Sequence, residues 1–474
     1  MLDQKQFEQL FYESFPYEPT SDQAELVKKL ALFLSSSEPS AVFILKGYAG
    51  TGKTTVVSNL VKVMPVLKAD TVLLAPTGRA AKVLAGYSGK PAYTIHRKIY
   101  ALRETAEGAV RFVLNHNKHV DTLFIVDEAS MISYQNDQDS GFGSGNLLDD
   151  LLSYVYSGEN CRLILIGDAA QLPPVKSSES PALNIPFLKN SFHLNIHAAE
   201  LKQVVRQEAE SGILHNATII RSRIESGETG FASFELDGFK DISRLQGPET
   251  ADYINDAYSE RNFENTIIVC RSNKRANLYN QGIRQRVLFM EDELGAGDLL
   301  MVVKNNYFWL PKDSKAGFIA NGDIVEVLRI QRTEELYGFR FAQVTIRMID
   351  YPNEPELDVV ILLDTLTSEG PALSYEEGGK LYDEVCRDYE DEPSKRKRMA
   401  KIRKNPYLNA LQVKFAYALT CHKAQGGQWE NVFVEQGFIP DKMPDTDYYR
   451  WLYTALTRST RKLYLMGFTD EFFD

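Results

Sequence analysis

The sequence predicts an α/β protein made of two α/β domains, with a small β-hairpin and a β-barrel inserted into them. Short, continuous apolar runs recur along the chain with helical patterns between them. Such runs are typical of parallel strands that are buried on both faces. The alternation is interrupted between about residues 300 and 411 by strand-like stretches with turn signals, which favours an inserted barrel. A chain of 474 residues is also too long for one compact core.

The first domain is expected over residues 1–190. Ser21 is expected to cap a helix with an apolar stripe of three leucines. A β-hairpin is expected within residues 97–119, with Glu107-Gly108 at its turn. The buried strands of this domain are predicted at Ala41–Leu45, Thr71–Ala75, Leu123–Val126 and Leu163–Ile166.

The second domain is expected in two pieces, residues 191–300 and 412–474, with the barrel over residues 301–411 between them. The barrel is expected to end in a charged, helical arm at about residues 376–404. The strands of the second domain are predicted at Thr266–Cys270, Phe415–Thr420, Asn431–Glu435 and Lys462–Met466. The strands of the barrel are predicted at Leu299–Val303, Ile324–Ile330, Gln343–Met348 and Asp358–Leu363.

Composition excludes several classes of protein. No basic segment followed by an apolar stretch opens the chain, and no apolar run approaches the ~18 residues of a membrane span, so a cytoplasmic protein without a membrane partner is expected. The four cysteines lie far apart and are expected to be buried thiols. The net charge of −11 counts against a purely electrostatic nucleic-acid binder, although a local groove can bind nucleic acid without a positive net charge.

The clearest motif is a phosphate-binding loop. Residues 47–54 read GYAGTGKT, follow an apolar run and open a helical pattern, which is the context this motif requires. Gly47, Gly50 and Gly52 let backbone N–H groups close around phosphate oxygens. Lys53 is expected to reach the β and γ phosphates of ATP, and Thr54 is expected to bind Mg²⁺. The neighbouring Thr55 is expected to contact the nucleotide as well.

A second motif supplies two carboxylates. Asp127 and Glu128 follow directly after the apolar run at Leu123–Val126. Asp127 is expected to hold Mg²⁺, and Glu128 is expected to position or deprotonate the attacking water. Acidic residues at strand ends are common, so this pair carries weight only together with the phosphate-binding loop.

Eight further strings are spread over nearly the whole chain. They are Asp22–Ala24, Ala75–Ala81, Thr94–His96, Val126–Met131, Gly167–Val175, Val205–Gln207, Thr420–Gly426 and Tyr453–Arg458. In this order they resemble the motifs of superfamily 1 helicases of subfamily B, near RecD and the phage Dda helicase. The resemblance implies two RecA-like domains, an SH3-like barrel opened by the turn at Asn321-Gly322-Asp323-Ile324, and 5′-to-3′ movement.

The resemblance assigns further residues to the ATP site. Gln23 is expected to recognise adenine, and Gln171 is expected to sense the γ-phosphate. Gln425 and Gly426 are expected to contact the nucleotide from the second domain. Arg206 and Arg458 are expected to act as arginine fingers, although Arg206 taken alone favours a surface ion pair. Because the donors come from both domains, ATP is expected to draw the domains together.

The resemblance also implies a single-stranded nucleic-acid track across both domains. Short hydroxyl and backbone donors grip phosphates without recognising sequence. The expected contacts are Pro76, Thr77, Arg79, Thr94, His96, Thr420 and His422. The hairpin within residues 97–119 is expected to act as a pin that splits the duplex, with Phe112 as its wedge residue. Tyr307, Phe308 and Trp309 are candidates for base stacking, but aromatic residues in strands are core residues more often. His96 is equally consistent with a structural role.

Three points stay open at this level. The basic segment Pro393–Arg398 is expected to be a solvated helical face, with contact to a nucleic-acid backbone as the alternative. An ATP-dependent nuclease subunit and a P-loop switch that acts on proteins are the competing functions. The expected partners are single-stranded DNA, duplex junctions and other repair or replication proteins, and a monomer is expected. The preference for DNA over RNA is not fixed by the sequence.

Overall fold

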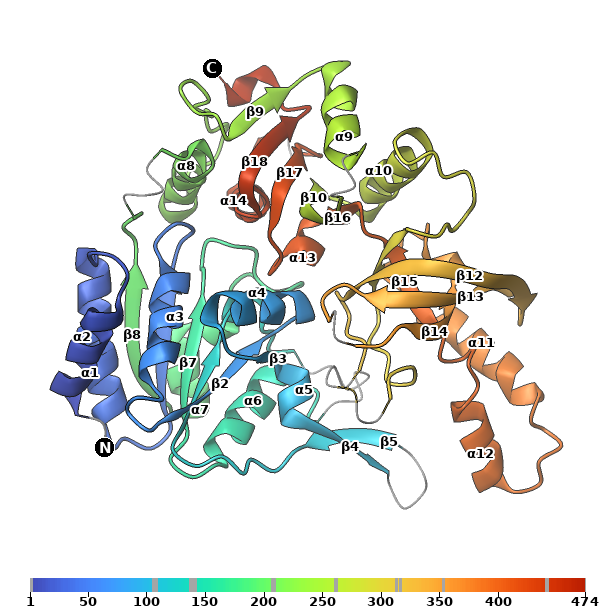
Figure 1. Cartoon of the computed structure of the whole chain (residues 1–474), viewed down its shortest axis with the longest axis horizontal. Coiled ribbons are helices and arrows are strands. Elements are labelled where there is room, and N and C mark those ends of the chain that lie inside the picture. The colour runs from blue at the N-terminus through green and yellow to red at the C-terminus, as the bar shows by residue number, and fades with distance from the viewer. Residues whose placement is uncertain are drawn as a thin grey trace.

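The structure is a computed structural model in which two α/β lobes lie one above the other and a β-barrel lies beside them (Figure 1). It describes residues 3–104, 110–135, 143–205, 210–259, 263–311, 314, 318–351, 354–439 and 443–473. The polypeptide fills the first lobe, enters the second, leaves it for the barrel and then returns to the second lobe, where it ends (Figure 1).

The first lobe is built on a parallel sheet with the strand order β3-β2-β6-β7-β1-β8. Its strands are β1 (Ala41–Gly47), β2 (Asp70–Ala75), β3 (Ala92–Thr94), β6 (Thr122–Val126), β7 (Arg162–Gly167) and β8 (Asn195–Leu201). The four predicted strands are present. The predicted boundary at residue 190 is too early, because β8 pairs with β1 along its whole length and completes this sheet.

Helices cover both faces of the first sheet, which explains why its strands are apolar throughout. They are α1 (Gln4–Ser14), α2 (Ser21–Ser35), α3 (Lys53–Val63), α4 (Gly78–Ser88), α5 (Ile95–Ile99), α6 (Leu147–Tyr156) and α7 (Ile185–Phe192). The capping residue of α2 is Thr20 and not Ser21 as predicted. The Thr20 hydroxyl accepts from the Gln23 N–H, and the Gln23 side chain accepts from the Thr20 N–H, so the two residues form a capping box.

A two-stranded antiparallel hairpin leaves the first lobe after α5 (Figure 1). It consists of β4 (Tyr100–Glu104) and β5 (Val110–Leu114), as predicted for this segment. The predicted turn at Glu107-Gly108 lies outside the described residues. The side of the hairpin nearest the lobe packs on it, since Tyr100 is buried and Phe112 and Leu114 contact the same apolar cluster.

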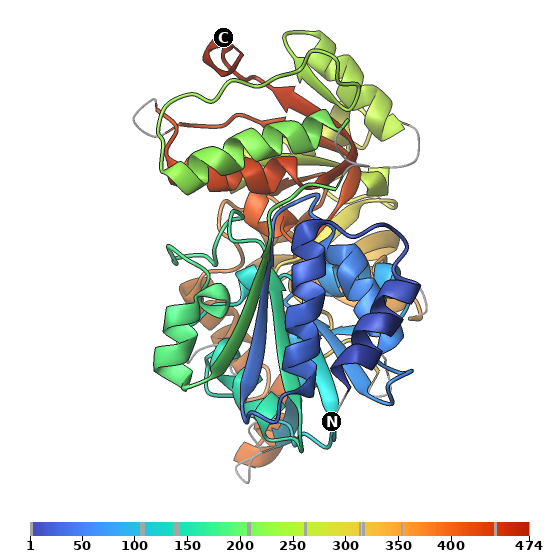
Figure 2. The same cartoon turned by 90° about the vertical axis from the view of Figure 1, so that its left-hand side faces the viewer.

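The second lobe has its own parallel sheet, with the order β16-β10-β17-β18-β9. Its strands are β9 (Ile242–Leu245), β10 (Thr266–Cys270), β16 (Ala418–Thr420), β17 (Trp429–Glu435) and β18 (Ser459–Met466). Its helices are α8 (Gly212–Ser226), α9 (Glu249–Ser259), α10 (Asn273–Arg286), α13 (Cys421–Ala424) and α14 (Thr446–Leu456). Figure 2 shows α8 and α14 side by side along one face of this sheet.

The inserted barrel is closed by five strands, which confirms the predicted barrel of the SH3-like type. They are β11 (Leu299–Val302), β12 (Ile324–Leu336), β13 (Phe339–Met348), β14 (Leu357–Leu362) and β15 (Leu411–Phe415). The strand predicted at Phe415–Thr420 is wrong. Phe415 ends β15 in the barrel and Ala418 begins β16 in the second sheet, so one apolar run serves two sheets. The predicted start of the second segment at residue 412 therefore falls inside a barrel strand.

The predicted helical arm follows β14 and consists of α11 (Tyr375–Arg387) and α12 (Lys395–Arg403). Leu381 and Val385 of α11 and Ile402 of α12 are buried. They pack with Phe341 and Val360 of the barrel in a small apolar cluster of their own. The arm is thus attached to the barrel through a few apolar side chains, and most of its charged residues are exposed.

One buried ion pair links the barrel to the second lobe. Arg284 of α10 donates from Nε and Nη2 to the two carboxylate oxygens of Asp298, at 2.8 and 2.9 Å, just before β11 begins. The Tyr417 hydroxyl donates to the same carboxylate at 3.0 Å. Such a pair is costly to break from one side, because the remaining charge stays buried without compensation.

We expect Asp298→Ala to lower the free energy of unfolding by about 3–5 kcal/mol, because it leaves the Arg284 guanidinium buried without its carboxylate. Glu326→Ala, which breaks the pair of half-buried Glu326 with exposed Arg347, is the matched control and is expected to cost less than about 1 kcal/mol. Urea denaturation followed by circular dichroism measures both. Equal losses in the two variants would contradict this role of Asp298.

Candidate nucleotide site and nucleic-acid interface

The predicted phosphate-binding loop joins β1 to α3 at the carboxyl edge of the first sheet. Gly52 precedes α3 with φ of +79°, a conformation that favours glycine. Lys53 lies over the loop, and its ammonium donates to the carbonyls of Gly47 and Tyr48 at 2.6 and 2.7 Å. A Cβ at Gly47 would lie 2.9 Å from Cγ of Lys53, so this position has no room for a side chain. The loop and the N-terminus of α3 form an anion-binding environment.

Gln23 lies directly against this loop. Its side chain is buried and donates from Nε2 to the Thr51 carbonyl at 3.2 Å. The capping box at the start of α2 fixes the same side chain from the other side. The role of Gln23 in recognising adenine stays a prediction, and the structure places the residue beside the loop that this role requires.

Asp127 and Glu128 lie at the same edge of the sheet, immediately after β6. Asp127 accepts a hydrogen bond from the Tyr87 hydroxyl at 2.6 Å and from the Glu128 N–H at 2.9 Å. Glu128 has φ of +51°, and such left-handed conformations at residues other than glycine concentrate at functional sites. Burial raises the pKa of Glu128 to about 7, while the positive charge of Arg458 opposes that rise. A carboxylate with a pKa near neutrality is suited to accept a proton.

The oxygen donors at this edge fit a magnesium ion. The Thr54 side chain is exposed, and the Asp127 carboxylate is half-buried. A hydroxyl and a carboxylate are the hard ligands that Mg²⁺ accepts alongside water and phosphate. Thr54, Thr55 and Tyr87 line a hollow of about 200 Å³ beside α3. In the described ranges, no cluster of three His, Cys, Asp or Glu side chains forms another metal site.

Hydrogen bonds from the second lobe reach the loop and the strand ends of the first. The Tyr453 hydroxyl accepts from the Ala49 N–H at 2.8 Å and donates to the Asp168 carboxylate at 2.7 Å. The Thr454 hydroxyl accepts from the Leu172 N–H at 2.8 Å. These bonds connect α14 to the phosphate-binding loop and to the segment after β7.

Gln425 and Gln171, predicted in different lobes, also meet at this junction. Gln425 donates from Nε2 to Oε1 of Gln171 at 3.3 Å and to the carbonyl of Leu172 at 3.1 Å. Gly426 has φ of +77°, and a Cβ there would lie 3.3 Å from the Thr77 hydroxyl oxygen. The two lobes are therefore in close contact at residues whose roles as nucleotide ligands remain predictions.

Arg458 is held by its own lobe and faces the acidic residues of the other. Its side chain is only 3% exposed. It donates to the carbonyls of Thr454 and Gly427 at 2.9 and 3.2 Å and to the Thr457 hydroxyl at 3.2 Å. Its charge acts on the pKa of Glu128 across the junction of the lobes. The second predicted arginine finger, Arg206, lies outside the described residues.

Several predicted track residues have structural partners at helix starts. The Thr77 hydroxyl caps α4 by accepting from the Ala80 N–H, and the Thr94 hydroxyl caps α5 by accepting from the Arg97 N–H, each at 3.2 Å. Pro76 and Thr420 are half-buried and His422 is exposed. The contacts of these residues with nucleic acid stay predictions.

Arg79 and His96 are half-buried, as are Pro76 and Thr420. The Arg79 guanidinium stacks over the Trp429 ring at 3.9 Å and donates to the Gln428 carbonyl at 3.4 Å, so it bridges the lobes. Burial lowers the pKa of His96 to about 4, which makes its ring neutral at physiological pH. A contact of His96 with phosphate would thus be a hydrogen bond of a neutral ring and not an ion pair.

The aromatic candidates pack against one another where the hairpin meets the barrel. The rings of Phe112 and Tyr307 lie 4.2 Å apart, and Tyr307 also contacts Phe318. Trp309 donates from Nε1 to the Asn409 carbonyl at 2.8 Å. The proposed wedge residue Phe112 is therefore a packing residue between hairpin and barrel.

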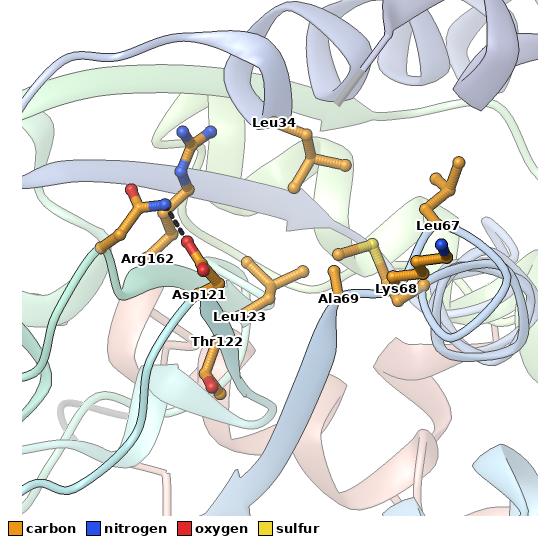
Figure 3. Close-up of a pocket in the computed structure, with 10 residues that line it drawn as sticks. Leu34, Leu67, Lys68, Ala69, Asp121, Thr122, Leu123 and Arg162 are labelled. Atoms are coloured by element: carbon orange, nitrogen blue, oxygen red, sulfur yellow. Dashed lines mark hydrogen bonds between the residues drawn. The ribbon is translucent and has the colours of Figure 1, made fainter. Parts of the chain in front are cut away.

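Two hollows lie away from the nucleotide site. One of about 240 Å³ lies at the amino edge of the first sheet, where Arg162, Asp121 and Leu123 line it (Figure 3). Another, of about 680 Å³, lies at the carboxyl edge of the second sheet and is lined by residues that include Arg271, Tyr279, Phe438 and Phe468. Ligands of open α/β sheets bind at carboxyl edges, so the second hollow is the better candidate for an interface.

Sequence patterns missed Tyr87, Trp429 and the hydroxyl role of Tyr453. Tyr453 and Trp451 are both buried. Tyr87 gave no signal, because its partner Asp127 lies 40 residues away on another element.

Of the cysteines, Cys161, Cys270 and Cys421 are buried as expected, and Cys386 is half-buried. No helix among the described residues is long and apolar enough to cross a membrane.

The fold and this site define a P-loop protein with two RecA-like lobes. The model of the AAA domain family matches residues 18–234, and the model of the UvrD-like helicase C-terminal domain matches residues 415–466. An uncharacterized protein of Methanocaldococcus jannaschii is 25% identical over 465 residues, which cover 90% of this chain and 36% of that protein.

Two characterised relatives are similar over shorter stretches. The ATP-dependent DNA helicase Dda of Enterobacteria phage T4 is 26% identical over 312 residues, covering 61% of this chain and 63% of the relative. The ATP-dependent RecD2 DNA helicase of Deinococcus radiodurans is 30% identical over 200 residues, covering 42% and 24%. A Pif1 helicase structure at forked double-stranded DNA has a TM-score of 0.49 and 16% identity, and covers 96% of this chain and 94% of its own. The chain thus resembles superfamily 1B helicases of the RecD and Dda type, as its motifs predict.

We expect Tyr453→Phe to speed hydrogen exchange at the Ala49 amide about 5-fold in protein without added nucleotide, because a buried hydrogen bond is worth about 1 kcal/mol. Tyr156→Phe is the matched control, since the Tyr156 hydroxyl bonds only within the first lobe, to the Ala41 carbonyl. Mass-spectrometric exchange of the peptide with residues 47–53 measures the effect. Unchanged exchange would show that the bond does not hold the lobes together in solution.

Proposed function

We propose that the protein is an ATP-dependent DNA helicase that couples ATP hydrolysis between its two lobes to 5′-to-3′ movement on single-stranded DNA. The observation that carries this proposal is the junction itself. Tyr453 and Arg458 of the second lobe meet the phosphate-binding loop and Glu128 of the first. A site shared by two lobes ties their relative position to the state of the nucleotide.

Each polar residue has a part in this scheme. Lys53 binds the β and γ phosphates, and Glu128 orients the attacking water and takes its proton. Thr54 and Asp127 hold Mg²⁺, which neutralises charge on the phosphates when it is bound. Arg458 supplies positive charge to the equatorial oxygens from the other lobe, in a planar donor geometry that lysine does not provide.

The strand is proposed to cross both lobes on the side of the barrel. Thr77 and Gly426 approach each other across the lobes, so a backbone passing there would touch both. Residue-level contacts with Pro76, Thr94, Thr420 and His422 belong to this proposal.

Finer assignments rest on the resemblance. They include the choice of DNA over RNA, the 5′-to-3′ direction, action at duplex junctions, a role in DNA repair or recombination, a monomeric state and a cytoplasmic location. The relatives Dda and RecD2 are ATP-dependent DNA helicases, which supports DNA as the substrate. We place the first domain boundary after β8, at about residue 201, and the return from the barrel to the second domain after β15, at about residue 415.

The test is ATP hydrolysis with and without single-stranded DNA, followed by unwinding of duplexes with 5′ or 3′ tails in DNA and RNA versions. A helicase of this kind hydrolyses ATP faster with the strand and unwinds the 5′-tailed DNA duplex. A P-loop switch that acts on proteins would show no stimulation by the strand. A nuclease subunit would cut the substrate as it unwinds it.

We expect Lys53→Ala to abolish ATP hydrolysis and Arg458→Ala to slow turnover roughly 10³–10⁵-fold with ATP binding nearly intact. Arg458→Lys is the control for packing, because it keeps the charge but loses the planar donors. Steady-state hydrolysis and binding of a fluorescent ATP analogue separate the two effects. Normal turnover in the Arg458→Ala variant would rule out a site shared by the two lobes.

We expect kcat/KM for ATP to rise as the pH increases through about 7 and then to level off, because Glu128 must lose its proton to act as a base. Its pKa is raised by burial, so the inactive protonated form dominates below that pH. The affinity for a non-hydrolysable analogue, measured over the same pH range, is the control for ionisation of the nucleotide. A value of kcat/KM that stays constant between about pH 5.5 and 8, where proteins are usually most stable, would exclude Glu128 as the titrating base.

A further inference from the structure

The helix at the end of the arm carries a concentration of positive charge that the proposed function leaves unexplained. Residues 395–404 contain seven lysines and arginines and no acidic residue, in a chain with a net charge of −11. They comprise Lys395, Arg396, Lys397, Arg398, Lys401 and Arg403 of α12, with Lys404 as its C-terminal cap.

Helix stability does not explain these charges. The first turn of α12 holds Lys395, Arg396 and Lys397 and no acidic residue. Cations near the N-terminus of a helix oppose its dipole, where aspartate or glutamate would be favourable. A local rule broken without a compensating contact points to a role outside the fold.

Pairing within the arm neutralises only part of this charge. Lys401 forms an ion pair with Glu392 at 2.8 Å, and Arg398 donates to the Glu392 carbonyl at 2.9 and 3.1 Å. The described residues give Lys395, Arg396 and Lys404 no carboxylate within 4 Å, and all three are exposed. The remaining acidic residues of the arm lie on α11 and in the connection before α12, so the charges of the arm are segregated by sign along the chain.

The anchoring of α12 leaves its charged face outward. Ile402 is the buried residue of this helix, and Met399 packs against the same apolar cluster. The cations of the first turn are on the exposed part of the helix. Several adjacent positive charges at the start of α12 therefore face the solvent.

The position of α12 relative to the hairpin of β4 and β5 points to a ligand for these charges. Figure 1 shows α12 at the lower right of the molecule, on the side toward which the hairpin of β4 and β5 extends. The barrel packs on the same hairpin through Tyr307 and Phe112. A duplex that reaches the end of the hairpin therefore lies on the side of the molecule where α12 is exposed.

We infer that the first turn of α12, with Lys395, Arg396 and Lys397, binds the phosphodiester backbone of duplex DNA at the point where the hairpin meets it. This inference rests on the proposed function. Lysine and arginine contacts to phosphates are independent of sequence and release condensed counterions, so their contribution is measured by salt dependence. The surface adds affinity for the duplex and none for the single strand.

The experiment compares a triple variant, Lys395→Gln, Arg396→Gln and Lys397→Gln, with a control that removes the same charge elsewhere: Lys5→Gln, Lys28→Gln and Lys189→Gln. The control lysines are exposed residues of α1, α2 and α7, outside the arm. Binding of a 5′-tailed DNA duplex and of the tail strand alone is measured by fluorescence anisotropy at several salt concentrations. Thermal unfolding verifies that both variants are folded.

We expect the arm variant to bind the tailed duplex roughly 10-fold more weakly at low salt, with a salt slope smaller by about 2–3, since each phosphate contact contributes about 0.9. Its affinity for the single strand and its strand-stimulated ATP hydrolysis should match those of the unmodified protein. Equal losses for both substrates, no loss, or the same loss in the control would each overturn the inference.

The proposed helicase function is tested by a different measurement from the one that tests the inference about α12. It fails if the unmodified protein shows no hydrolysis stimulated by the single strand. The inference about α12 is judged only from the difference between the two variants on the duplex.

Discussion

The Tyr453 hydroxyl takes part in two hydrogen bonds that cross the junction of the lobes, one from the Ala49 N–H and one to the Asp168 carboxylate. Because the side chain is buried, each bond forms in a medium where an unsatisfied partner would be costly. The phosphate-binding loop, the segment after β7 and α14 are therefore constrained together. Arg458 follows α14 by two residues, and Glu128 follows β6 at the same edge of the first sheet as the loop, so this constraint bears on how the two residues face each other.

The barrel is an insertion that the second lobe holds from two sides. The Arg284 and Asp298 pair fixes the entry of the chain into β11, and Tyr417, between β15 and β16, fixes its exit by donating to the same carboxylate. The two crossings of the polypeptide thus meet at one buried carboxylate. A barrel anchored in this way moves with the second lobe as one body, and its contact with the hairpin of the first lobe follows any change between the lobes.

Sequence patterns were informative where a residue and its context are close in the chain. The loop at residues 47–54 and the carboxylates Asp127 and Glu128 could be placed together because parallel strands bring their carboxyl ends to one edge. The barrel and the arm were also predicted, since turn signals and charge patterns are local. Patterns failed where tertiary pairing decides: β8 joins the first sheet, and the run at Phe415–Thr420 is divided between two sheets. The partners of Arg79 and Tyr87 lie on other elements, and no spacing in the sequence could indicate them.

Helix α4 has different neighbours at its two ends. Its N-terminal cap Thr77 lies against Gly426 of the second lobe, and Tyr87 near its C-terminus donates to Asp127. The helix has 11 residues. A displacement of the residues before α4 would therefore be carried along one continuous helix to the Tyr87 hydroxyl and to the Asp127 carboxylate that accepts its hydrogen bond.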